Sequence, residues 1–120
     1  MSHMILLGFT AAKTVYVPFY RNMTLKSARY VSTASSAKDG SNYFELKVYA
    51  NDGTEILAAW TNHNPSGQDF TGGVPVAKSL VNMDEGDFDS TQVCKVESTL
   101  HGTGTIGGHL LLEFADARSY

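Results

Sequence analysis

Cysteine is scarce in this chain, which has 120 residues and a single cysteine, Cys94. One cysteine excludes a disulfide bond within the chain. Cys94 stands in a strand-like pattern, at a position that suits a small apolar side chain. We therefore predict a buried thiol, in a protein made in a reducing compartment.

Clustered positive charge is also lacking. The chain has nine Lys and Arg residues against twelve Asp and Glu, for a net charge of -3, and the basic residues form no patch along the sequence. A protein that binds nucleic acid normally presents a basic face to the phosphates. We therefore expect no nucleic acid partner.

Long apolar runs and helical stripes are missing as well. No stretch of about 12 residues carries an apolar stripe at helical spacing. The N-terminal segment Met1–Phe9 is apolar but short, and it lacks the cationic flank of an export signal, so we expect no membrane partner. Ser2-His3-Met4 resembles a cloning remnant, which makes Met4 a candidate natural start and gives His3 no weight as a ligand.

What the chain does have is apolar alternation at the strand period of two. Its composition, 42% apolar and 18% charged, is that of an ordinary globular domain. Phe44, Leu46, Val48 and Ala50 form the clearest alternating segment. The same period is seen in four further segments: Val15 to Phe19, Leu25 to Tyr30, Cys94 to Leu100 and Leu110 to Phe114.

Two of these segments carry an additional signal. Pro18 cannot donate a ladder hydrogen bond, so its strand is expected at a sheet edge or a bulge. Between Leu25 and Ala28 the apolar phase slips by one residue, as a β-bulge requires.

The connections favour an antiparallel fold. Asn51-Asp-Gly53 predicts a hairpin turn, because Asp-Gly supplies the positive φ of a tight reversal. With about eight strands, we predict an all-β antiparallel β-sandwich, with an eight-stranded jelly roll as the leading topology. Residues 14–120 form its single domain. Residues 1–13 are either an N-terminal arm that adds to a neighbour's sheet or a first strand of the same sandwich, the strand being favoured.

The polar segment Asn62–Pro75 is too long for a tight hairpin and is predicted to be a surface loop that carries contacts. Outside it, Tyr16, Tyr20, Tyr43 and Tyr49 are predicted either at outward interface positions or in the core. Trp60 is assigned to the core.

Catalytic and metal-binding chemistry finds little support. The carboxylates of Asp84–Asp89 do not match a calcium-loop spacing and are predicted to form a turn. His63, His101 and His109 show no zinc spacing, and the glycine-rich segment His101–Thr105 precedes a strand where a phosphate cradle needs a helix. We expect no catalytic residue, metal or cofactor, and therefore no enzyme. A cupin-type enzyme remains a competitor that would need clustered histidines inside the barrel.

The strand cadence resembles that of small phage virion jelly rolls. The residues concerned are Thr14–Tyr20 with its Pro-Phe pair, Met23–Val31 with its Leu-x-Ser-Ala cadence, Val81 with Glu85-Gly-Asp87, the strand to Val96, Gly102-Thr-Gly104, and Leu110–Phe114. The resemblance implies a capsid decoration (cement) protein, or a knob on a head or tail fibre. Such a protein is made in the host cytoplasm, lies on the capsid exterior, and binds the major capsid protein as a homotrimer.

The resemblance also implies where the contacts lie. In such proteins the N-terminal arm often touches the shell or a neighbouring protomer, and we expect capsid or inter-subunit contacts from Met4, Ile5, Leu6, Leu7, Phe9, Tyr16 and Tyr20. The loop is the second candidate, through Asn62, His63, Asn64, Gln68, Asp69 and Phe70. The alternative is a receptor- or carbohydrate-binding module, in which Trp60, Tyr43, Tyr49 and this loop would hold a glycan.

Overall fold

The computed structural model describes residues 2–78 and 87–116. Nine strands lie in these residues: β1 (Ser2–Phe9), β2 (Lys13–Pro18), β3 (Met23–Ser32), β4 (Tyr43–Tyr49), β5 (Ile56–Thr61), β6 (Pro75–Lys78), β7 (Asp87–Phe88), β8 (Val93–His101) and β9 (Gly108–Asp116). No helix among the described residues is long and apolar enough to cross a membrane.

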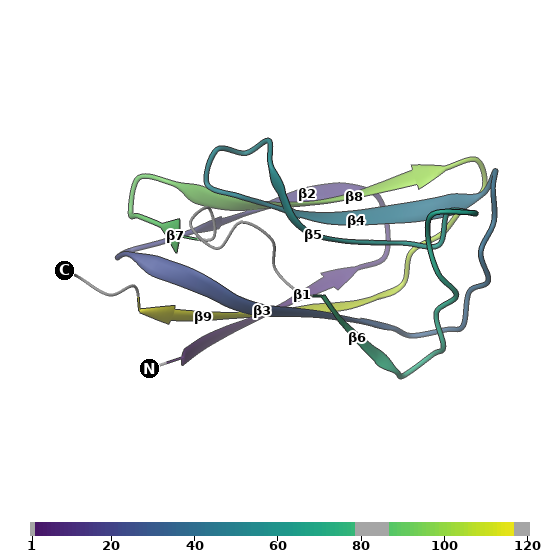
Figure 1. Cartoon of the computed structure of the whole chain (residues 1–120), viewed down its shortest axis with the longest axis horizontal. Coiled ribbons are helices and arrows are strands. Elements are labelled where there is room, and N and C mark those ends of the chain that lie inside the picture. Colours follow the sequence, from purple (N-terminus) through teal and green to yellow (C-terminus); the bar gives the residue numbers. More distant parts are fainter. Residues whose placement is uncertain (1, 79–86, 117–120) are drawn as a thin grey trace.

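The strands form two antiparallel sheets that pack face to face (Figure 1). One sheet has the order β1-β9-β3-β6, with β7 also paired to β3, and the other has the order β2-β8-β4-β5. The predicted all-β antiparallel sandwich is confirmed. Apolar alternation did not single out two of the nine strands, β6 and the two-residue β7.

The N-terminal segment is a strand of this sandwich. Its eight residues pair with β9 of the same chain, from Ser2 opposite Ala115 to Phe9 opposite Gly108. Of the two alternatives for this segment, the intramolecular strand is therefore the one observed.

The predicted bulge lies in β3. Leu25 is opposite Phe114 on β9, but Ser27 is opposite Glu113, so the intervening Lys26 has no partner in the ladder. The extra residue lets Leu25 on one side of the bulge and Ala28 on the other both point into the core. Pro18, as expected, lies on an edge strand, at the end of β2.

The Asp-Gly turn joins β4 to β5 as predicted. Gly53 has φ of 75°, a value that costs a residue with a Cβ atom. Oδ1 of Asp52 accepts hydrogen bonds from the main-chain N–H groups of Thr54 and Glu55, each at 2.9 Å. These two bonds stabilise the carboxylate and hold the pKa of Asp52 below its ordinary value.

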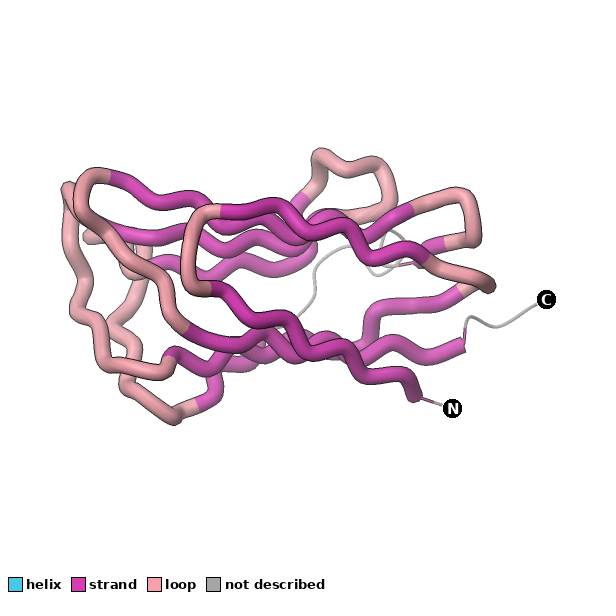
Figure 2. Tube along the Cα trace, turned by 180° about the vertical axis from the view of Figure 1, so that it is seen from behind, coloured by secondary structure: helices cyan, strands magenta, loops and turns pink. Residues whose placement is uncertain are grey.

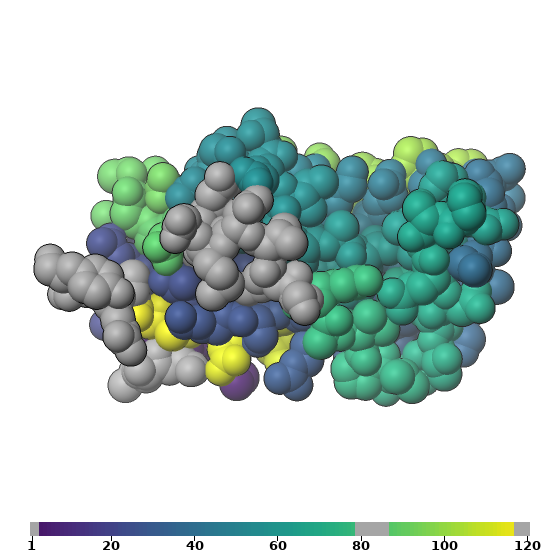
Figure 3. Space-filling model, in the orientation of Figure 1, coloured from purple at the N-terminus to yellow at the C-terminus, as the bar shows by residue number. Residues whose placement is uncertain are grey.

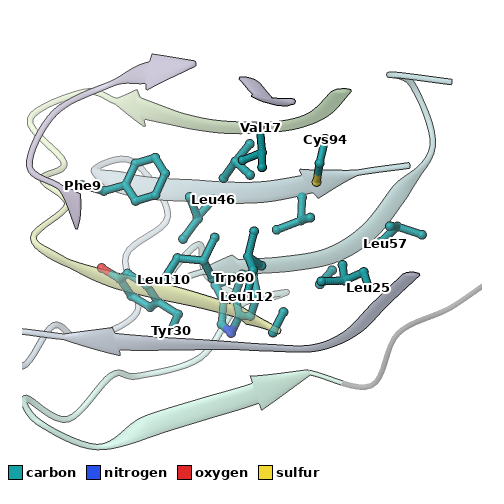
Figure 4. Close-up of a cluster of buried hydrophobic side chains, with 14 of the residues drawn as sticks. Phe9, Val17, Leu25, Tyr30, Leu46, Leu57, Trp60, Cys94, Leu110 and Leu112 are labelled. Carbon is teal, nitrogen blue, oxygen red and sulfur yellow. The ribbon is translucent and has the colours of Figure 1, made fainter. Parts of the chain in front are cut away.

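The core lies between the sheets and is filled by the inward side of the alternating strands (Figure 4). Its largest fully buried side chains are Trp60, Tyr30, Phe9, Phe44, Phe88, Phe114, Leu25, Leu46, Leu57, Leu110, Leu112 and Val48. Trp60 is a core residue as predicted, and its Nε1–H donates to the carbonyl of Val76 at 2.9 Å.

Cys94 is buried in the same core, as predicted. Its Sγ lies 3.7 Å from the carbonyl oxygen of Tyr49, to which the thiol donates. Removal from water disfavours the thiolate and raises the pKa of Cys94 to about 12. The thiol is therefore a packing group at neutral pH.

Candidate functional site

The outward face of β1 exposes large apolar side chains. Because β1 alternates, Ile5 and Leu7 pack against the core, while Met4 and Leu6 are 65% and 64% exposed. On the neighbouring strand β9, the half-buried Leu111 lies opposite Leu6 and extends the apolar surface. Contiguous exposed apolar side chains of this kind are typical of a contact surface.

β1 also has an open edge. It is the last strand in its sheet order, so its outer side has no paired strand among the described residues. Figure 2 shows it starting at the N-terminus, with β2 joined to it by a short loop. The edge strands β2 and β6 each contain a proline and a lysine, which oppose pairing with another chain, whereas the edge strands β1 and β5 contain neither.

A groove of about 240 Å³ lies beside this edge. It is lined by His3, Met4, Ile5, Pro18, Phe19, Tyr20, Met23 and Phe114. Tyr20 is 72% exposed and Met4 is 65% exposed, and both line the groove, so an apolar partner could contact both. The aromatic rings beneath the groove are packed together. The centre of the Phe19 ring lies 4.9 Å from that of Phe88, in a stacked arrangement, and 5.1 Å from that of Phe114, edge-on.

An ion pair lies beside Tyr20, next to the groove residue His3, whose Nε2 is 3.7 Å from Oδ1 of Asp116. The guanidinium of Arg21 lies 5.0 Å from the centre of the Tyr20 ring, and its Nη2 is 2.9 Å from Oδ1 of Asp116. Both ionic side chains are 42% exposed, so the pair adds little stability. The groove is therefore mainly apolar, with polar and charged side chains beside it, an arrangement common in binding surfaces.

The predicted N-terminal contacts are only partly brought together. Met4, Leu6 and Tyr20 lie on or beside the β1 edge. Tyr16 is 61% exposed but lies on β2 of the other sheet, opposite Lys95. Phe9 is a correction: its side chain is fully buried, because it ends the inward series of β1 and fills the core.

The segment Asn62–Pro75 was expected to offer contacts along its length, and this is wrong for two residues. Asn62 is buried: its Oδ1 accepts from the N–H of Phe44 at 2.9 Å, and its Nδ2 donates to the carbonyl of Ala37 at 3.1 Å. Phe70 is also buried, and its main chain bridges to Ser36. The main-chain N–H and C=O groups of a long loop need hydrogen-bond partners. Asn62 and Phe70 contribute by bonding to the loop between β3 and β4.

The other predicted loop residues are tied to the body more loosely. Oε1 of Gln68 accepts from Nζ of Lys78 at 3.1 Å, and Oδ1 of Asp69 accepts from the N–H of Lys38 at 2.7 Å. Asn64 is exposed, although its main-chain N–H donates to Asp39. These hydrogen bonds hold the loop against the rest of the fold. Among the predicted contact residues of the loop, Asn64 and Asp69 are exposed.

Sequence spacing missed a cluster of aromatic rings on the outer face of the second sheet. The ring of Tyr43 is stacked between His63 and His101, with centroid distances of 4.0 and 4.3 Å. Nε2 of His101 lies 2.8 Å from Oε1 of Glu45. The outward phase of Tyr43 and Glu45 was visible in the sequence, but their pairing with His101 depends on the β4–β8 register.

This arrangement differs from a metal centre. In the part of the chain that the structure describes, no group of three potential ligands is found. His63 and His101 are separated by the Tyr43 ring, and His109 lies exposed on β9 of the other sheet. The clustered histidines inside the barrel that a cupin-type enzyme needs are not formed by these three residues.

Residues 84–86 of the acidic segment Asp84–Asp89 lie outside the described residues, and so does Val81. Its described end behaves as a turn: Oδ1 of Asp89 accepts from the N–H of Thr91 at 2.8 Å and from the Thr91 hydroxyl. These bonds lower the pKa of Asp89. The glycine-rich segment after β8 is a loop, as predicted, with Gly102 at φ of 62°.

No protein-family model, no curated protein and no solved structure matches this chain. Its function is therefore argued from its own residues and contacts.

Proposed function

We propose that this protein is a non-enzymatic structural component of a phage virion, and specifically a capsid decoration (cement) protein. In this role it binds the major capsid protein as a homotrimer on the outside of the head and stabilises the shell. The observation that carries the proposal is the apolar, open edge of β1, with Met4 and Leu6 exposed beside the Tyr20 groove.

The strand pairing supports the jelly-roll part of the proposal. A jelly roll is a long antiparallel ribbon wrapped around a core. Here the first half of the chain pairs with the second half in reverse order: β1 with β9, β2 with β8, β3 with β6, and β4 with β5. Consecutive strands from β1 to β4 alternate between the two sheets, as wrapping of such a ribbon requires.

The β1 edge has the properties that an assembly contact needs. An added strand would form main-chain hydrogen bonds along Ser2–Phe9, and the exposed Met4 and Leu6 would be removed from water. The sheet behind the edge is packed on a continuous core, so docking orders little additional chain. Three linked subunits would then multiply a modest contact by avidity.

The aromatic platform of the alternative function, a glycan-binding module, is not supported. Trp60 is 1% exposed and cannot stack on a sugar. Both faces of Tyr43 are already occupied by His63 and His101. The ring of Tyr49 has the ammonium of Lys95 over it, at 4.3 Å from the ring centre.

Co-sedimentation with capsids that lack the protein tests the proposal. We expect the wild-type chain to bind stoichiometrically and Leu6→Glu to bind at least tenfold more weakly, because a charge replaces an apolar contact on the β1 face. Ile56→Glu is the matched control, since Ile56 is also exposed but lies on β5 of the other sheet. Absence of stoichiometric binding by the wild-type chain would refute the proposal.

Light scattering tests the trimer separately. Three chains of 13.0 kDa give about 39 kDa in solution. A monomer at micromolar concentration that also stays monomeric on the capsid would contradict the trimeric part of the proposal.

A further inference from the structure

The outer faces of the two sheets differ in how their charges are paired. On the sheet β2-β8-β4-β5, Nζ of Lys47 lies 3.6 Å from Oε2 of Glu45. The carboxylate of Glu97 accepts hydrogen bonds from the hydroxyls of Thr14 and Tyr49, each at 3.3 Å. This face therefore has the internally paired polar groups of a surface that faces solvent.

The outer face of the sheet β1-β9-β3-β6 carries a strip of apolar side chains. In Figure 1 this sheet is the lower of the two, and in Figure 3 yellow atoms of β9 are seen at the lower side of the molecule. The apolar strip continues from Met4 and Leu6 of β1 onto the next strand, since Leu111 lies opposite Leu6. We call the outward residues beyond β1 the β9–β3–β6 face: Leu111 and Glu113 on β9, Arg29 and Val31 on β3, and Pro75 and Ala77 on β6.

Two opposite charges lie on different strands of this face. Arg29 is exposed on β3, and Glu113 is half-buried on the adjacent strand β9, one row further along the ladder. Among the described residues no ion pair includes either of them. Oε1 of Glu113 instead accepts a hydrogen bond from the hydroxyl of Ser27 at 3.1 Å. Both charges are therefore open to pairing with another molecule.

This pattern favours a second copy of the same chain as the partner. A surface with a guanidinium on one strand and a carboxylate on the next is complementary to itself, because Arg29 of one copy can face Glu113 of another. The apolar neighbours of the two charges would be removed from water at the same contact. A partner of uniform charge would instead meet one of the two side chains with like charge.

We propose that the β9–β3–β6 face is the contact between the chains of the homotrimer in solution. This inference rests on the trimer of the proposed function and names its interface. Around a three-fold axis Arg29 of each copy pairs with Glu113 of the next, and three identical contacts close the ring. The contact leaves the open edge of β1, at the border of the same sheet, free for the capsid.

Sedimentation velocity of the full chain at micromolar concentration tests the proposal. We expect the wild-type chain to sediment as a trimer of about 39 kDa, three times 13.0 kDa. Arg29→Glu would place two carboxylates at each contact, and Glu113→Arg would place two guanidinium groups there. Each variant should therefore raise the concentration of half-assembly at least tenfold.

The double variant Arg29→Glu with Glu113→Arg decides whether the two side chains meet. It restores opposite charges at every contact, so the trimer should return. Lys95→Glu is the matched control and should stay trimeric, because it makes the same change of charge on β8, opposite the exposed Tyr16 on the outer face of the other sheet. Urea unfolding followed by Trp60 fluorescence shows that each variant is folded. If a reversal does not fold, Arg29→Gln and Glu113→Gln remove the same charges without reversing them, and each should still weaken the trimer.

The outcomes separate this contact from the capsid role. A wild-type chain that is monomeric or dimeric at micromolar concentration overturns the inference, and so does a folded double variant that is no more trimeric than the single variants. A wild-type monomer that still co-sediments with capsids would refute the contact and leave capsid binding standing. A chain that follows all the expectations above but binds no capsid would support the contact and refute only the capsid role.

Discussion

Stability at alkaline pH should depend on the Cys94 thiol. The folded protein holds this thiol fully buried, with its pKa raised to about 12 from an ordinary value of 9.0. In the unfolded chain the thiol ionises near its ordinary pKa, but in the folded chain it must stay protonated. The stabilisation is therefore complete below pH 9 and is lost as the pH rises from 9 towards 12.

The magnitude follows from the size of the pKa shift. Each pH unit within this window removes about 1.4 kcal/mol from the free energy of unfolding. Between about pH 8 and about pH 10 the wild-type chain should lose about 1.4 kcal/mol through Cys94 alone. The pKa values of Tyr30 and Tyr49 are also raised, so these two phenols lower the free energy of unfolding further at high pH. A variant without the Cys94 thiol undergoes the same tyrosine-dependent loss.

Urea unfolding at the two pH values, followed by the fluorescence of the single tryptophan, measures this effect. Trp60 is buried in the folded core, so unfolding changes its surroundings. Cys94→Ala is the comparison, because it removes the titrating group and leaves the other alkaline groups in place. If the wild-type chain and Cys94→Ala lose the same stability between these pH values, the thiol is not held protonated and the reasoning fails.

Three further predictions concern turns and packing. Gly53→Ala should lower the free energy of unfolding by about 1–2 kcal/mol in urea titrations, because Gly53 has φ of 75° and an added Cβ meets only open space; equal stability would contradict the strain. Leu112→Ala should cost about 2–5 kcal/mol by the same assay, because Leu112 is fully buried in β9, and a loss under 1 kcal/mol would place it outside the core. Acid titration should remove stability as the pH falls below 3.8, since main-chain bonds depress the pKa of Asp39 and Asp52; Asp52→Asn should reduce this acid dependence, and an unchanged profile would exclude Asp52 as a contributor.

Much of the fold was predictable because local patterns determine local geometry. Alternation at a period of two predicted that Phe44, Leu46 and Val48 lie on the inner face of β4, and all three are buried in the structure. The slip after Leu25 predicted the bulge, since a shift of one residue would otherwise turn Ala28 outward. The Asp-Gly pair predicted the β4–β5 hairpin for a similarly local reason.

The candidate sites were less predictable because they combine distant segments. Met4 and Tyr20 were both expected to make contacts, but the sequence did not place them around one groove. The stacking of His63 and His101 on Tyr43 requires a particular strand register and a folded-back loop. The burial of Asn62 could not be read from its polar surroundings, since its partners, Phe44 and Ala37, lie on other segments.

By itself the sequence determined the fold class, the inward or outward phase of the main strands and the burial of Cys94, because each follows from side-chain period, turn chemistry or local polarity. Only the tertiary structure decided which strands lie at the edges of the sheets and which loop residues are buried. Edge positions are set by sheet order, and hydrogen-bond partners by contacts between residues far apart in the chain. The exposed Met4 and Leu6 and the buried Tyr30 phenol are consequences of that long-range packing.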